Sequence, residues 1–190
     1  MPYTPIIGTL GYVLSPDRQR VLMVRRSREG DLHQGKYNGL GGKLEPDEDV
    51  VTCLVRELRE EAGIEVTSLR LRGTISWPGF GSSGEDYSSL RSSSPSSSSD
   101  EPEQARLAAQ TSSDWFGFVF VVDAFTGTAP DRNDDGPLEW VELDRLADLP
   151  LWEGDRHFLP LVFGDGPAFH GVMPYADGHP VSWSYTTLTQ

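Results

Sequence analysis

Cysteine, basic residues and long apolar runs are what this sequence has least of. Its 190 residues include a single cysteine, Cys53, so no disulfide can form within the chain, and no CxxC pair suggests a zinc site. No uninterrupted apolar stretch is long enough to span a bilayer, and the N-terminus lacks a basic region ahead of a signal-like segment. We therefore expect a cytoplasmic protein without a membrane partner, in which Cys53 is a buried apolar thiol.

Positive charge is scarce. Lysine and arginine total 16 against 29 aspartates and glutamates, which gives a formal net charge of -13 at pH 7. A field of this sign repels DNA, RNA and anionic lipid, so we expect no nucleic-acid polymer as partner. A small anionic ligand stays open, because a bound divalent metal and a few local cations can reverse the field inside a pocket.

The chain length fits one domain over residues 1–190, acting as a monomer or a homodimer. Residues 79–113 depart from the rest, because serine fills positions 88, 89, 92–94 and 96–99. Such a composition cannot bury enough apolar surface to offset its ordering entropy. It predicts a disordered insertion with a short helix at 103–110; a lid over the site and a regulated serine tract are the alternatives.

The ordered part of the chain alternates strand-like and helix-like patterns. Such a mixture predicts an α/β sandwich. The expected elements are strands at 8–14 and 20–25 forming a hairpin, a glycine-rich loop at 28–42, a helix at 46–62, one long strand or a strand pair at 65–77, strands at 115–125 and 138–143, a helix near 155–162, and a closing hairpin from 169–175 and 180–188.

The helix expected at 46–62 has two different faces. Pro46 suits a helix start and Gly63 a C-terminal cap. One narrow apolar stripe at helical spacing should pack on the sheet; it consists of Val51, Leu54, Val55, Leu58 and Ala62.

The other face carries Glu57, Glu60 and Glu61, whose i, i+3 and i+4 spacing places three like charges together. A solvated acidic face is the bland interpretation. Two observations favour a ligand site instead: the carboxylates repel one another, and a glycine-rich loop lies next to them in the sequence. Clustered carboxylates are hard ligands for Mg²⁺ or Mn²⁺, which bridge to substrate phosphates.

These glutamates belong to the run GKLEPDEDVVTCLVRELREEAGI, which starts at Gly42 and ends at Ile64. It has Gly42, five residues, Glu48, seven residues, then REL, any residue, EE, any residue, and Gly63–Ile64. The run resembles the Nudix box at every defined position. The resemblance implies the Nudix fold, an α/β/α sandwich with a mixed β-sheet, and hydrolysis of a pyrophosphate bond.

The resemblance also implies roles within the box. Glu57, Glu60 and Glu61 would ligate Mg²⁺, or Mn²⁺, with the Gly42 carbonyl adding a ligand. Arg56 would orient the glutamates, with an ordinary surface arginine as the alternative, and Glu48 would join the outer shell. Our hypothesis for the general base is Glu60 or Glu61.

Three further segments resemble the oxidised purine nucleoside triphosphatases of the MutT type: GKYNGLGGK, LPLWEGDRHFLPL, and FHGVMPY with SWSYTTL. The resemblance implies that Asn38 hydrogen-bonds the purine edge, Trp152 stacks on the base and Asp155 reads its polar edge. Each has an alternative, since Asn38 suits a turn, Trp152 a core and Asp155 a helix N-terminus. Trp77 and Thr9 resemble additional pocket lining, with core or strand packing as the alternative.

Two departures from that family matter. Its adjacent acidic residues correspond to Glu153, Gly154 and Asp155, so Gly154 replaces the first acid and discrimination of an oxidised base is in doubt. Its later-strand metal ligand aligns with Phe116, and the nearest acid on the same face is Asp114. The local cations closest to the expected phosphate path are Arg25, Arg26 and Lys43, although an ordinary surface residue is the favoured interpretation of each taken singly.

The pattern leaves three functions open. The first is hydrolysis of a purine nucleoside triphosphate, in particular an oxidised one such as 8-oxo-dGTP, to nucleoside monophosphate and pyrophosphate. The second is another Nudix reaction, on ADP-ribose, nucleotide sugars or dinucleoside polyphosphates. The third is a non-catalytic nucleotide sensor, which would not need an intact carboxylate cluster.

Overall fold

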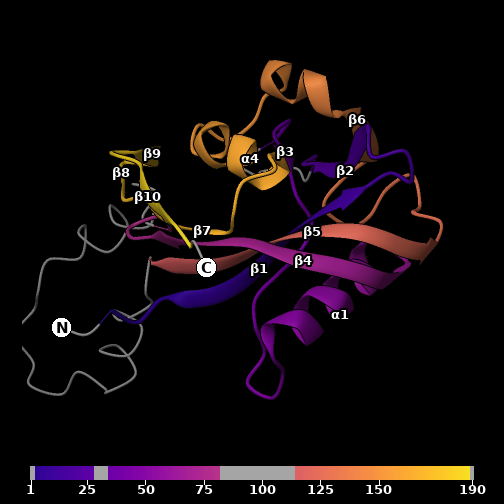
Figure 1. The fold of residues 1–190 in the computed structure, drawn as a ribbon, viewed down its shortest axis with the longest axis horizontal. Coiled ribbons are helices and arrows are strands. Elements are labelled where there is room, and N and C mark those ends of the chain that lie inside the picture. The colour runs from indigo at the N-terminus through magenta and orange to yellow at the C-terminus, as the bar shows by residue number, and fades with distance from the viewer. Residues whose placement is uncertain (1–2, 28–33, 82–113, 189–190) are drawn as a thin grey trace, which may run out of the picture.

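A computed structural model describes residues 3–27, 34–81 and 114–188 of the protein. Its main feature is an eight-stranded sheet with helices on both faces (Figure 1). The elements in chain order are β1 (Ile6–Leu14), β2 (Arg20–Arg25), β3 (Tyr37–Asn38), α1 (Val50–Ala62), β4 (Ile64–Trp77), β5 (Trp115–Gly127), β6 (Leu138–Glu142), the 3₁₀ helix η1 (Leu143–Asp148), α4 (Asp155–Phe163), β7 (Phe169–Val172), β8 (Tyr175–Ala176), β9 (His179–Pro180) and β10 (Ser184–Thr187).

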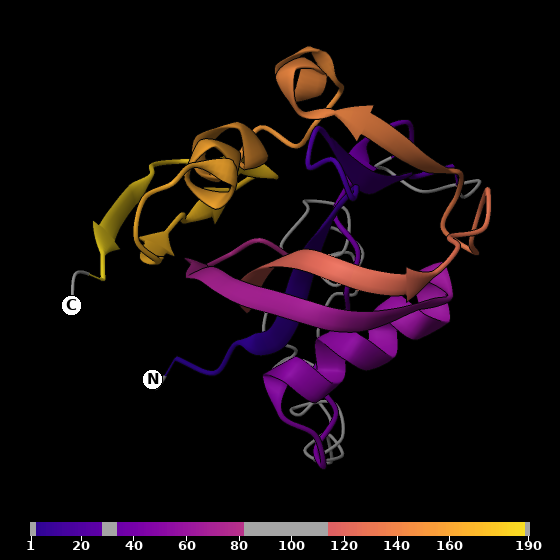
Figure 2. The same ribbon diagram turned by 45° about the vertical axis from the view of Figure 1, so that its right-hand side comes forward.

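The strands lie in the order β10-β7-β4-β5-β1-β2-β3, and β6 also pairs with β2. The pairs β1–β5 and β4–β7 are parallel and the others antiparallel, so the sheet is mixed. Helix α1 covers one face, while α4 and η1 lie on the other (Figures 1 and 2). The expected α/β/α sandwich with a mixed sheet is confirmed.

Alternation along the central strands builds a separate core on each face. In β1, Tyr12 and Leu14 join the core under α4, whereas Val13 joins the core under α1. Successive side chains of a strand point to opposite faces, so a strand covered on both sides is apolar throughout. This explains the nearly continuous apolar runs that the sequence shows in β2 and β5.

Helix α1 begins four residues later than the sequence predicts. Asp49 caps it, because its Oδ1 accepts hydrogen bonds from the backbone N–H groups of Val51 (2.8 Å) and Thr52 (3.1 Å). Pro46 therefore lies in the turn before the helix. The C-terminal prediction is confirmed: Gly63 has φ of 62° and its N–H donates to the Arg59 carbonyl.

The predicted apolar stripe of α1 needs one correction. Leu54, Leu58 and Ala62 are fully buried and Val55 is half-buried, but Val51 is 41% exposed. Val51 lies in the first turn beside the exposed cap. Cys53 is fully buried as predicted, and its thiol contacts the Thr9 hydroxyl at 3.5 Å.

The remaining elements follow the expected order. Strands β1 and β2 form the opening hairpin, the segment after α1 is one long strand, and β7 pairs with β10 as the closing hairpin. The glycine-rich loop contains the short strand β3. Residues 79–81 form a turn, whereas the rest of the expected insertion, with its serine tract and the helix at 103–110, lies outside the described residues. No helix in the described ranges is long and apolar enough to cross a membrane.

Candidate active site

Two glycines bring the loop before α1 against strand β1 and two of the helix's glutamates. Gly41 has φ of 138°, and a side chain there would overlap the Thr9 backbone. Its N–H donates to Glu61 Oε2 at 2.9 Å. A Cβ on Gly42 would lie 2.7 Å from Glu57 Oε2, so that carboxylate packs directly on the glycine. The loop backbone thus touches both glutamates.

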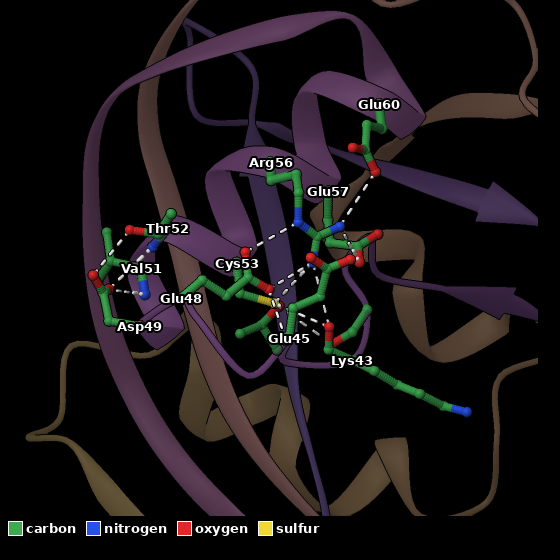
Figure 3. Close-up of polar contacts among 12 residues, drawn as sticks. Lys43, Glu45, Glu48, Asp49, Val51, Thr52, Cys53, Arg56, Glu57 and Glu60 are labelled. Atoms are coloured by element: carbon green, nitrogen blue, oxygen red, sulfur yellow. Dashed lines mark hydrogen bonds and ion pairs between the residues drawn. The ribbon is translucent and has the colours of Figure 1, made fainter.

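Arg56 organises the acidic face of α1 (Figure 3). Its guanidinium binds both oxygens of Glu48, at 2.7 and 3.0 Å, and donates to Glu57 Oε1 at 2.9 Å and Glu60 Oε2 at 3.3 Å. The hydrogen bonds from Arg56 lower the pKa of Glu48 to about 2. Arg56 therefore contacts carboxylates of the box, the arrangement that an orienting role requires.

Glu61 lies in a less favourable environment for a charge. Burial raises its pKa to about 7, its bond from Gly41 opposes that rise, and the charges of Glu57 and Asp135 add to it. Asp135 lies in the loop between β5 and β6, where it pairs with Arg26 at 3.8 Å. It lines a second cavity together with Glu60 and Glu61. No spacing signal in the sequence points to Asp135, because it lies 74 positions after Glu61.

The donors at this place fit a divalent cation. Two carboxylates, Glu57 and Glu61, meet the Gly41–Gly42 backbone, and their mutual repulsion is what a cation would relieve. Glu60 is turned differently, with a side chain that is 59% exposed and bonded to Arg56. Within residues 3–27, 34–81 and 114–188, no three acidic, histidine or cysteine side chains form a ready-made cage. Mg²⁺ is commonly held by one or two carboxylates plus substrate phosphates, so the pair suffices.

Next to this loop lies a cavity of about 320 Å³, a size suited to a nucleobase-like ring. Gly41 and Gly42 form part of its wall, so the cavity adjoins the glutamates. All six residues predicted from the sequence to contact substrate line it: Thr9, Arg26, Asn38, Trp77, Trp152 and Asp155.

The structure narrows the alternatives for three of these residues. Asn38 lies in strand β3, paired with Val24, and not in a turn. Trp152 is half-buried at the cavity wall, with the Lys36 ammonium 5.4 Å from its ring centre. Asp155 does begin helix α4, yet the residue is 8% exposed and its Oδ2 is buried without a hydrogen-bond partner among the described residues. Burial raises the pKa of Asp155 to about 7.

Sequence reasoning missed three aromatic residues of the cavity, namely Phe80, Trp115 and Tyr175. The ring centre of Phe80 lies 5.0 Å from that of Tyr175 and 5.5 Å from that of Trp152. Phe80 lies at the start of the segment assigned to the serine-rich insertion. The composition of that segment predicted disorder, so Phe80 was not considered as a site residue. Trp115 and Tyr175 looked like ordinary strand residues, and only the sheet order brings them to the site.

The remaining candidates lie elsewhere or are engaged. Asp114 accepts a hydrogen bond from the Gly79 N–H at 2.8 Å. The acids whose charges raise the pKa of Glu61 are Glu57 and Asp135. Phe116 packs edge-on against Phe118. Arg25 pairs with Glu139 at 3.0 Å. The two other residues noted in the sequence are exposed: Glu153 pairs with His179, and the Lys43 ammonium lies 5.5 Å from the Trp115 ring centre.

Known proteins resemble this chain in sequence and in fold. The chain is 27% identical over 163 residues to the uncharacterised Nudix hydrolase YvcI of Bacillus subtilis, covering 86% of this chain and 83% of the relative. It is 29% identical over 159 residues to the mouse oxidized purine nucleoside triphosphate hydrolase, covering 84% and 80%. The fold resembles that of a MutT protein from Bacillus halodurans, with a TM-score of 0.70, 23% identity, and coverage of 95% and 97%.

The family follows from the extent of these matches. The NUDIX domain profile matches residues 5–162, from the strand that opens the sheet through most of α4. Its match contains the box, the glycine loop and all six predicted cavity residues. The chain belongs to the Nudix family and is a Nudix hydrolase.

Proposed function

We propose that this hydrolase cleaves purine nucleoside triphosphates, with oxidised purines such as 8-oxo-dGTP as favoured substrates, to nucleoside monophosphate and pyrophosphate. The single observation that carries the proposal is the shared cavity. Six residues named from the sequence line it, and its wall continues into the Gly41–Gly42 backbone that touches Glu57 and Glu61. A base and the phosphate chain attached to it can therefore occupy adjoining places.

The composition of the cavity suits a nucleobase. Trp77, Trp115 and Trp152 offer flat aromatic surfaces, and stacking on such rings is worth roughly 1–3 kcal/mol per base. Asn38 and Asp155 offer amide and carboxyl groups to the polar edge of the ring. A few polar groups among aromatic walls are typical of sites that orient one small molecule.

The phosphates would lie between the cavity and α1. Arg26 lines the cavity and pairs with Asp135, so its charge stands beside the acidic loop. Glu57 and Glu61, with the Gly42 carbonyl, would hold Mg²⁺ or Mn²⁺, and Glu60 would join them when a cation competes with Arg56 for its carboxylate. Such a cation neutralises phosphate charge and activates water.

The chain's own residues would orient and deprotonate the reacting groups. Arg56 holds Glu57 in place through a bond that Glu48 supports from the other side. Glu60 or Glu61 would take the proton from the attacking water. Wild-type turnover by both the Glu60→Gln and the Glu61→Gln variants would remove that role.

The name of the mouse relative agrees with this substrate class, and the relative aligns over 84% of this chain. The main rival is another Nudix reaction, because the box reads the pyrophosphate and not the rest of the substrate. Substrate choice therefore depends on the cavity. All the glutamates of the box are present in the sequence, which argues against a non-catalytic sensor.

The test is a substrate panel with product analysis. We would compare dGTP, 8-oxo-dGTP, 2-hydroxy-dATP, ADP-ribose and a diadenosine polyphosphate with Mg²⁺, using the Glu60→Gln/Glu61→Gln double variant as the inactive control. Pyrophosphate release from the triphosphates, fastest for the oxidised ones, is the expected result. Turnover confined to ADP-ribose, with two monophosphate products, would refute the proposal. Equal rates for dGTP and 8-oxo-dGTP would remove the preference for oxidised bases.

A further inference from the structure

The space beside Gly154 is filled by groups from the closing hairpin. A Cβ built on Gly154 would overlap the Tyr175 hydroxyl oxygen and lie 2.6 Å from Met173 Sδ. No side chain larger than hydrogen fits there without displacing them. The position where the resembling family has an acid is therefore occupied, in this protein, by a phenol that arrives from a different element.

Tyr175 is held firmly in that place. It is 9% exposed, its N–H donates to the Pro78 carbonyl at 2.7 Å, and the Phe80 ring packs edge-on against it at an interplanar angle of 90°. Tyr175 lines the same cavity as Asp155, and the charge of Asp155 contributes to raising the pKa of Tyr175. In the described part of the chain, no residue makes a hydrogen bond to the Tyr175 hydroxyl, and Asp155 Oδ2 also lacks a partner.

Two polar groups of different character, the Tyr175 phenol and the Asp155 carboxyl, thus line the same cavity. Burial, followed by the charges of Asp155 and Glu153, raises the pKa of Tyr175, so the phenol stays neutral and can donate a proton. The Asp155 Oδ2, which has no hydrogen-bond partner among the described residues, is a carboxyl oxygen that can accept one. Two adjacent carboxylates would favour a ring edge with two donors, whereas a phenol beside a carboxylate favours an acceptor next to a donor.

We propose that Tyr175 is a specificity-determining residue, whose hydroxyl donates to a ring carbonyl while Asp155 accepts from the adjacent ring N–H. The substrate class is then a purine with a lactam edge, which is a carbonyl beside an N–H, as in guanine at position 6 or in 8-oxopurines at position 8. This inference rests on the proposed function, because it assigns the base that the triphosphate carries.

The test removes one oxygen atom. Tyr175→Phe keeps the ring and its packing on Phe80, and Tyr185→Phe on β10, where the side chain is 48% exposed, is the matched control. Steady-state kinetics with Mg²⁺ would compare dGTP and 8-oxo-dGTP with the triphosphate of 2-aminopurine deoxyriboside, which has neither lactam edge. A second variant, Gly154→Ala, would displace the hydroxyl and leave Tyr175 itself unchanged.

We expect Tyr175→Phe to raise KM for at least one of the lactam substrates about five- to tenfold, the effect of losing one neutral hydrogen bond and leaving its partner unpaired. The kcat values, KM for the 2-aminopurine compound and the Tyr185→Phe control should stay within about twofold of wild type. Gly154→Ala should raise the same KM. Equal effects on all three substrates, or no effect of Tyr175→Phe on either lactam substrate, would refute the inference while the proposed function stands. Failure of the wild type to hydrolyse any triphosphate would overturn both.

Discussion

Replacing Asp155 with asparagine should change how the stability of the protein depends on pH. Burial raises the pKa of Asp155 from its ordinary value of 3.8 to about 7. Between these values the folded chain binds one proton more than the unfolded chain, so the free energy of unfolding falls as pH rises, by about 1.4 kcal/mol per pH unit. The whole effect is roughly 4 kcal/mol, absent below pH 3.8 and fully developed above about pH 7. Asparagine has nearly the same shape and does not titrate.

The assay is urea unfolding of the wild type and Asp155→Asn at several values from pH 5.5 to 8, which avoids precipitation near the pI of about 4.6. Over this interval the variant should gain about 2 kcal/mol relative to wild type, because most of the proton release occurs there. That gain corresponds to a shift of about 1 M in the urea midpoint. Asp148→Asn, an exposed change in η1, is the control. Stability curves for wild type and Asp155→Asn that stay parallel from pH 5.5 to 8 would refute the assignment of a protonated, buried Asp155.

Three further predictions concern α1 and its loop. Gly42→Ala should lower kcat by about 10²-fold with little loss of structure by circular dichroism, because a Cβ overlaps the Glu57 carboxylate; activity within threefold of wild type would contradict this packing. Leu58→Ala should lower the free energy of unfolding by about 3 kcal/mol, whereas Val51→Ala should cost under about 0.5 kcal/mol; similar losses would contradict the corrected stripe. Without nucleotide, Mg²⁺ should raise the thermal midpoint of the wild type and not that of Glu57→Gln/Glu61→Gln, and an equal rise in both would place the cation elsewhere.

The features that sequence reasoning predicted well depend on local rules. Helix α1, its C-terminal cap at Gly63 and the alternation of β1 follow from periodicity over a few residues. The late start of α1 was missed because Pro46 suits a helix start, and only the bonds from Val51 and Thr52 identify Asp49 as the cap. The helical pattern was correct, but it did not locate the first residue of the helix.

Some residues of the candidate site were likewise predicted from local motifs, and others were not. Motif positions gave Asn38, Trp152 and Asp155, and the structure brings them into one cavity. Asp135 and Tyr175 were not predictable from the sequence. Asp135 comes near Glu61, and Tyr175 near Gly154, only through the order of the strands in the fold. Tyr175 reaches Gly154 from a hairpin 21 positions later, and nothing in the sequence indicates that a phenol fills the space of a missing side chain.

Among the described residues, the positive charge near the acidic face of α1 does not compensate all of its carboxylates. Arg56 commits two of its bonds to Glu48 and single bonds to Glu57 and Glu60, which leaves Glu61 without its help. Glu61 instead meets a backbone N–H, the distant charge of Arg26 and two neighbouring acids, and burial raises its pKa to about 7. Removing a neighbouring acid would relieve this repulsion, but so would a cation that both carboxylates can reach. Such clustering costs stability in the free protein, which is what we expect of the cation site proposed at Glu57 and Glu61.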